Sequence, residues 1–84
     1  EDVWYTWWNG NEVAIGVTCA PIVPDMQICI NGEIYPTAVG EQFISAIYSC
    51  EGKEFPMTLH ISLTSEELGD VAVEETVLVI EKNP

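Results

Sequence analysis

Residues 3–17 read VWYTWWNGNEVAIGV, and this stretch decides the fold. Aromatic and β-branched residues stand on both sides of the pair Asn9-Gly10. Such a pattern is the strongest short-range signal for a β-hairpin, because Asn and Gly accept the positive φ angles of a tight two-residue turn. We therefore predict two antiparallel strands joined at Asn9-Gly10, with the rest of the chain laid against them.

A two-residue turn at this pair also predicts the register of the hairpin. Successive side chains of a strand point to opposite faces, so the register sorts the residues into two sets. The expected core face comprises Trp4, Thr6, Trp8, Val13, Ile15 and Val17. The opposite face comprises Tyr5, Trp7, Glu12, Ala14 and Gly16. A slip of one residue would exchange the two sets.

The second of these faces is the candidate binding site, with Tyr5, Trp7 and Glu12 as its residues. Two interpretations are open. The two rings either pack under a loop or a second sheet, as most large aromatic side chains do, or they form an exposed platform for a sugar ring, a peptide or a protein surface.

A second Asn-Gly pair, Asn31-Gly32, predicts a second hairpin. Here a two-residue turn places Ile28 opposite Tyr35 and Cys29 opposite Ile34. The side chain of Cys29 is then expected to point away from the core side of its strand.

Three further segments carry strand signals. Residues 57–63 alternate strictly between apolar and polar, which predicts a half-buried strand. The apolar run 77–80 is typical of a strand covered on both faces. Residues 42–50, QFISAIYSC, fit a helix or a strand, and their β-branched and aromatic content favours the strand.

About seven short strands with frequent turns predict an all-β fold, a small antiparallel β-sandwich or barrel, in a single domain over residues 1–84. The alternative is an α+β fold with one helix near residues 38–50. An immunoglobulin-like layout is expected as an architecture only, because Cys19 and Cys50 lie too close in sequence for the disulfide of that family and no Trp separates them.

Charge narrows the range of partners. Fourteen acidic residues stand against Lys53 and Lys82, with no arginine, so the formal net charge is −12. Contacts to phosphate need Lys and Arg, so we expect neither nucleic acid nor anionic lipid as a partner. No apolar run reaches the length of a membrane span, so membrane insertion is not expected either.

The acidic residues crowd most densely near the C-terminus. This acidic patch comprises Glu66, Glu67, Asp70, Glu74 and Glu75. Clustered carboxylates can hold Ca²⁺, but the spacing of a calcium-binding loop is absent. We interpret the patch as a solvated charge run and expect no metal site.

The remaining reactive side chains give no catalytic pattern. The spacings of Cys19, Cys29 and Cys50 match no zinc motif, and we expect buried thiols or one disulfide at most. His60 lies on the polar side of its predicted strand and is interpreted as a surface or structural residue. The chain also lacks a glycine-rich phosphate loop, so we expect neither an enzyme nor a cofactor.

These observations predict a non-enzymatic binding module of an extracellular, cell-surface or virion protein, with a protein or carbohydrate partner bound through the aromatic face. The alternative is an acidic inhibitor that mimics nucleic acid and docks on a basic groove. The chain begins at Glu1 with no signal-peptide pattern, which is typical of a processed chain or of a domain from a longer protein.

Overall fold

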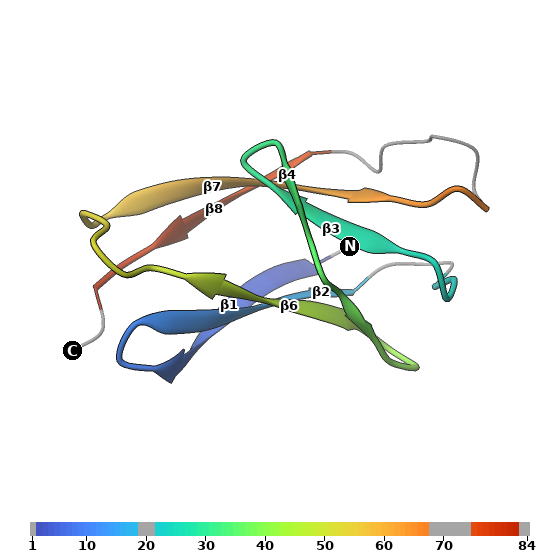
Figure 1. Cartoon of the computed structure of the whole chain (residues 1–84), viewed down its shortest axis with the longest axis horizontal. Coiled ribbons are helices and arrows are strands. Elements are labelled where there is room, and N and C mark those ends of the chain that lie inside the picture. Colours follow the sequence, from blue (N-terminus) through green and yellow to red (C-terminus); the bar gives the residue numbers. More distant parts are fainter. Residues whose placement is uncertain (1, 19–21, 68–74, 83–84) are drawn as a thin grey trace.

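The computed structural model describes residues 2–18, 22–67 and 75–82, and Figure 1 shows their arrangement. These residues form eight strands and no helix. The strands are β1 (Asp2–Asn9), β2 (Glu12–Thr18), β3 (Gln27–Ile30), β4 (Glu33–Tyr35), β5 (Ala38–Val39), β6 (Ile44–Ser49), β7 (Met57–Thr64) and β8 (Thr76–Ile80).

The strands form two antiparallel sheets that face each other. The first sheet has the order β1-β2-β6-β5 and the second has the order β4-β3-β7-β8. In Figure 1 the two sheets lie as separate layers, and the chain passes from one to the other between β4 and β5. The predicted all-β sandwich is confirmed, and its two sheets have distinct edges, unlike a closed barrel.

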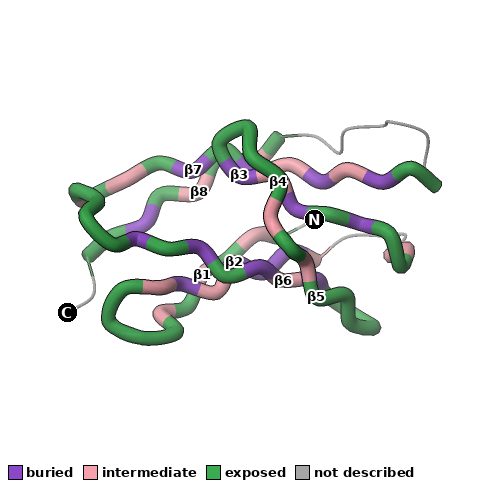
Figure 2. The backbone as a smooth tube through the Cα atoms, in the orientation of Figure 1, coloured by how far each residue is buried: buried purple, intermediate pink, exposed green. Residues whose placement is uncertain are grey.

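The alternative helix near residues 38–50 is wrong, because residues 44–49 form β6 inside the first sheet. The strand pattern prevails because Ile44, Ala46 and Tyr48 all point into the core. Figure 2 shows the resulting alternation of buried and more exposed positions along β6 and β7. The predicted strand at 57–63 is confirmed as part of β7.

Aliphatic side chains fill the space between the two sheets. The fully buried ones come from five strands: Val13, Ile15, Val17, Ile28, Ile30, Ile44, Leu59, Ile61, Leu63 and Ile80. Burying a side chain of this size contributes about 1.5–3 kcal/mol relative to its exposure to water. This apolar layer is the main source of stability for the sandwich.

The second hairpin has the predicted register. Ile28 pairs with Tyr35 and Cys29 with Ile34, while Asn31 and Gly32 have φ angles of 51° and 85°. Positive φ at both central residues is the signature of a type I′ turn, whose twist matches that of the flanking strands.

Asn31 also joins this turn to β7. Its backbone N–H donates to the carbonyl of His60 at 2.9 Å, and the N–H of His60 donates to Asn31 Oδ1 at 2.9 Å. The asparagine side chain therefore extends the ladder between β3 and β7 beyond the last residue of β3.

The predicted register of the first hairpin is wrong by one residue. Trp7 pairs with Val13 and Tyr5 with Ile15, and the ladder is irregular at Trp8. Tyr5 and Trp7 consequently lie on the core side, half-buried and packed against the core. The β1 residues of the two sets have therefore exchanged faces, as a one-residue slip of β1 requires. The β2 residues Val13, Ile15 and Val17 lie in the core, as predicted.

The turn itself explains this difference. Asn9 pairs with Glu12, so the central residues are Gly10 and Asn11, and Gly10 does not adopt a positive φ. Instead, the N–H of Asn11 donates to Asn9 Oδ1 at 2.9 Å, and Asn9 Nδ2 donates to Glu12 Oε1 at 2.6 Å. The side chain of Asn9 thus closes the turn in place of type I′ geometry, and the irregularity at Trp8 accommodates the additional residue.

The expectation that residues 77–80 are covered on both faces is also wrong. β8 is an edge strand of the second sheet, with Leu78 and Ile80 turned inward. Val77 and Val79 are turned outward and are 54% and 51% exposed. An apolar run on its own does not distinguish a central strand from an edge strand.

Polar contacts close two sides of the sandwich. At the crossing from β4 to β5, Thr37 Oγ1 accepts a hydrogen bond from the N–H of Ile28 at 2.7 Å and donates to the carbonyl of Tyr35 at 3.1 Å. On the opposite side, the N–H of Glu81 donates to Tyr5 Oη at 3.1 Å. The second contact links β1 to the end of β8.

We predict that the two hairpin glycines respond differently to Ala. Both have open space around the Cβ position, but only Gly32 has a positive φ. Gly32→Ala should therefore destabilise the fold by about 1–2 kcal/mol, whereas Gly10→Ala should change stability by less than about 0.5 kcal/mol. Urea unfolding of both variants measures the difference, and equal effects would contradict the assigned turn conformations.

Candidate binding surface

Residues turned away from the core on β1, β2 and β6 form a continuous outer face of the first sheet. Strand pairing arranges them in two rows, one of Trp4, Gly16 and Ser45 and one of Thr6, Ala14 and Ile47. Phe43, just before β6, joins them through its contact with Trp4. We refer to these seven residues as the outer face.

Trp4 is held in place by its neighbours. A Cβ atom at Gly16 would collide with the six-membered part of its ring, so the indole lies directly against the glycine backbone. The ring centroid is 5.7 Å from that of Phe43, with the planes tilted by 59°. Trp4 and Phe43 remain 38% and 46% exposed, so the two rings are both positioned and accessible.

The outer face carries no charge, although the chain has a net charge of −12. Among the described strand residues on this side of the sheet, the charged ones are Asp2 and Glu12, which lie at opposite ends of the hairpin. Asp2 pairs with Thr18, and the carboxylate of Glu12 accepts the hydrogen bond from Asn9. An uncharged interior with acidic residues at its ends is the general pattern of a contact surface.

The candidate residues Tyr5, Trp7 and Glu12 do not form a common surface. Tyr5 and Trp7 point inward and pack half-buried against the core, which agrees with the first of the two interpretations and not with an exposed platform. Glu12 lies at one end of the β2–β6 ladder, opposite Ser49. A binding role for these three residues stays a prediction.

The exposed aromatic residues of the hairpin are instead Trp4 and Trp8, and Trp8 is 68% exposed. One signal in the sequence points to the position of Trp4. Gly16 interrupts a strand of otherwise larger residues, and glycine inside a strand often marks the close approach of another group. The sequence gives no comparable signal for Phe43, because this residue lies just before β6 and outside the alternating pattern of the strand.

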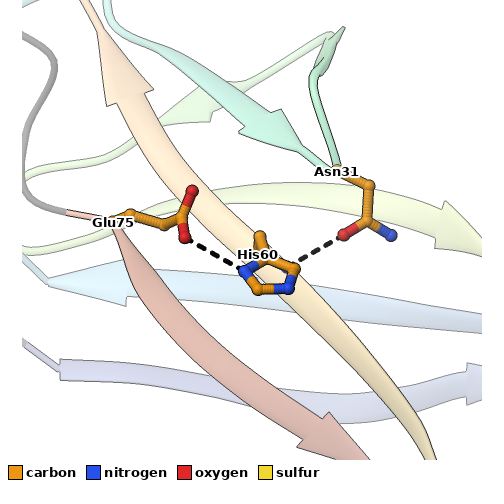
Figure 3. Close-up of polar contacts among 3 residues, drawn as sticks. All are labelled: Asn31, His60 and Glu75. Carbon is orange, nitrogen blue, oxygen red and sulfur yellow. Dashed lines mark hydrogen bonds and ion pairs between the residues drawn. The ribbon is translucent and has the colours of Figure 1, made fainter.

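Of the predicted acidic patch, Glu66, Glu67 and Glu75 are described and exposed, whereas Asp70 and Glu74 lie outside the described residues. Figure 3 shows Glu75 beside His60, with Oε1 3.0 Å from Nδ1 of the imidazole. An exposed pair of this kind contributes little to stability, because water screens it.

The first part of the patch is attached to the loop before β3. Ser65 Oγ donates to Asp25 Oδ1 at 2.6 Å, and the N–H of Glu67 donates to Asp25 Oδ2 at 2.9 Å. These hydrogen bonds lower the pKa of Asp25 below its ordinary value of 3.8, and the one from Ser65 has the largest effect. Asp25 therefore holds the connection after β7 against the opposite loop.

His60 also donates its backbone N–H to Asn31, as Figure 3 shows. Its imidazole Nδ1 lies within hydrogen-bond distance of the Glu75 carboxylate. The contacts of His60 are those of a residue that links β7 to the start of β8.

Cys29 and Cys50 are free thiols, and Cys19 lies outside the described residues. Burial raises the pKa of the Cys50 thiol, and the nearby positive charge of Lys53 opposes this shift. Across residues 2–18, 22–67 and 75–82, no three His, Cys, Asp or Glu side chains lie close enough together to hold a metal ion.

No protein-family model, curated protein or solved structure matches the chain. The part of the chain that the structure describes contains no helix with the length and apolar character needed to cross a membrane.

We predict that Gly16→Ala displaces Trp4 from the sheet. Alanine lowers the conformational entropy of the unfolded chain, which on its own favours folding by about 0.5–1 kcal/mol. The collision with the indole outweighs this gain, so we expect a net destabilisation of about 1 kcal/mol and greater solvent exposure of Trp4. Acrylamide quenching and urea unfolding test both effects, with Gly10→Ala as the control. Unchanged quenching with increased stability would contradict the contact.

We also predict that Asp25 contributes a pH-dependent part of the stability. Because its pKa is lower in the folded state, the contribution is fully present above pH 3.8 and is lost as the pH falls through the folded-state pKa. Asp25→Asn should therefore lose less stability than the parent chain on acidification below about pH 4. Urea midpoints measured against pH test this, with Glu41→Gln as a control of equal charge change. Parallel curves for the parent chain and Asp25→Asn would show that Asp25 has no such role.

Proposed function

We propose that this chain is a non-enzymatic binding module that contacts a protein or carbohydrate partner through the outer face of the first sheet. The observation that carries the proposal is an uncharged surface with two positioned aromatic rings, Trp4 and Phe43, on a chain with fourteen acidic residues. Exposed apolar patches bounded by polar residues commonly mark interaction sites.

The geometry of Trp4 supports this role in two ways. Because Gly16 and Phe43 position its ring before any partner arrives, little side-chain entropy is lost on binding. A large aromatic side chain at the centre of a contact surface also supplies more binding energy than most other residues. The hydroxyl groups of Thr6 and Ser45 lie in the same rows and can donate or accept hydrogen bonds at the edge of a sugar ring or a peptide.

The surrounding charges favour a neutral or basic partner. The carboxylates of Asp2 and Glu12 lie near the ends of the hairpin, and Glu41 lies in the loop between β5 and β6. Charges at the rim of an interface mainly affect the association rate and the choice of partner, whereas the uncharged centre contributes the affinity.

The proposal includes an immunoglobulin-like layout. In that layout one sheet has the order A-B-E-D and the other contains C-F-G. The orders β1-β2-β6-β5 and β4-β3-β7-β8 correspond to it, with β4 as an additional edge strand beside C. Many cell-surface domains have this architecture, so we extend the proposal to an extracellular, surface-exposed or virion setting. This last step rests on an analogy of fold.

A screen against neutral oligosaccharides and displayed peptides, followed by affinity measurements with the best ligand, tests the proposal. We expect Trp4→Ala to lower the affinity by about tenfold or more, because the central ring is removed. Val79→Ala, on the outer side of the second sheet, is the matched control and should bind as the parent chain does. Equal affinities for Trp4→Ala and the parent chain would reject the outer face as the contact surface.

The salt dependence of the same binding distinguishes the acidic-inhibitor alternative. Contact through the uncharged outer face predicts an affinity that changes by less than about threefold between about 0.05 and 0.5 M salt. Charge mimicry on a basic groove predicts an affinity that falls steeply over this range. A steep fall that is unaffected by Trp4→Ala would favour the acidic inhibitor.

A further inference from the structure

A cavity of about 610 Å³ lies at one end of the sandwich, away from the outer face. The turn between β1 and β2, the loop between β6 and β7, and the residues after β8 come together there, on the left in Figure 1. Its volume is within the range of cavities that bind small molecules. The residues that matter for its chemistry are Trp7, Cys50, Lys53, Glu54, Phe55 and Lys82.

The cavity contains both lysines of the chain. Lys53 and Lys82 are the only Lys or Arg residues among 84, yet they line the same cavity although 29 positions separate them in sequence. Within the described residues, the ion pair that is present joins His60 to Glu75, so neither ammonium group is paired with a carboxylate. Two unpaired cations in one cavity attract an anion.

The loop that carries Lys53 is fixed locally. The backbone N–H of Lys53 donates to the carbonyl of Cys50 at 3.1 Å, which closes the turn after β6. The positive charge of Lys53 acts on the Cys50 thiol, which also lines the cavity. Among the described lining residues the carboxylate is that of Glu54, so the positive charge of the two ammonium groups exceeds the negative charge there.

Aromatic rings supply the other part of the lining. Trp7 and Phe55 pack with ring centroids 5.8 Å apart and planes tilted by 57°. Trp7 lies there because the register of the first hairpin turns it inward, so its ring faces the cavity region and not the outer face. Tilted rings beside an open volume offer an apolar surface to a planar or ring-shaped group.

We propose that this cavity binds a small carboxylate carried on a ring, with the carboxylate at Lys53 and Lys82 and the ring against Trp7 and Phe55. An aromatic acid and an acidic sugar both present this combination. The combination also explains why the cavity holds both kinds of group. A simple inorganic anion would not use the aromatic rings, and a neutral ring would not use the lysines.

Titration of the ¹⁵N-labelled chain with benzoate and with glucuronate, followed by NMR, tests the proposal. We expect millimolar binding, with shifts at residues of the cavity and loss of affinity on raising the salt concentration. Binding of benzoate alone identifies an aromatic acid as the ligand class, and binding of glucuronate alone identifies an acidic sugar. Benzamide, acetate and inorganic phosphate should bind at least about threefold more weakly than the better acid. Equal binding of acetate or phosphate, or no binding of either acid, would overturn the proposal.

Variants of the chain distinguish binding at the cavity from an effect of net charge and from binding at the outer face. Lys53→Gln and Lys82→Gln should each weaken binding about three- to tenfold. Gln42→Glu produces the same net charge at an exposed position outside the cavity and should bind normally. Trp4→Ala should also bind normally, so failure here is distinguishable from failure of the proposed outer-face contact. Equal losses in Lys53→Gln and Gln42→Glu would show that only the net charge matters.

Discussion

The register of β1 on β2 is the constraint on which the rest of the molecule depends. The irregularity at Trp8 and the turn closed by Asn9 place Trp7 opposite Val13. This single alignment sends Tyr5 and Trp7 toward the core and leaves Trp4 on the outside. Because side chains alternate in a strand, the register of β1 decides for all of its rings at once whether each one points toward the core or toward the outer side.

Both proposed binding regions follow from this alignment. The indole of Trp4 lies against Gly16 because the two residues pair directly across the ladder. Trp7 reaches the end of the sandwich, where it packs against Phe55 and lines the same cavity as the two lysines. The hairpin therefore distributes its aromatic rings between an open surface and a more enclosed cavity, and the two regions have different electrostatic character.

The sequence was sufficient for the fold class and for most strands, since alternation in residues 57–63 and the Asn31-Gly32 turn have one physical interpretation each. It was insufficient where two local solutions have similar energies. Asn9-Gly10 fits a type I′ turn, but the side chain of Asn9 stabilises a different turn whose advantage comes from packing Trp7 on the core. The exposure of β8 and the presence of Lys53 and Lys82 in one cavity depend on sheet order, which no local pattern encodes.

Edge strand β8 has a consequence for how copies of this chain behave toward one another. Its outward valines, Val77 and Val79, and its position at the edge of the sheet formed by the described strands are features that favour strand-to-strand aggregation. Glu75 and Glu81 stand directly before and after the strand and act as gatekeeper residues. In an antiparallel pairing of two copies, Glu75 of each would approach Glu81 of the other, and this repulsion opposes growth of a fibril. The two glutamates thus protect an edge strand whose apolar residues Val77 and Val79 are exposed on one side.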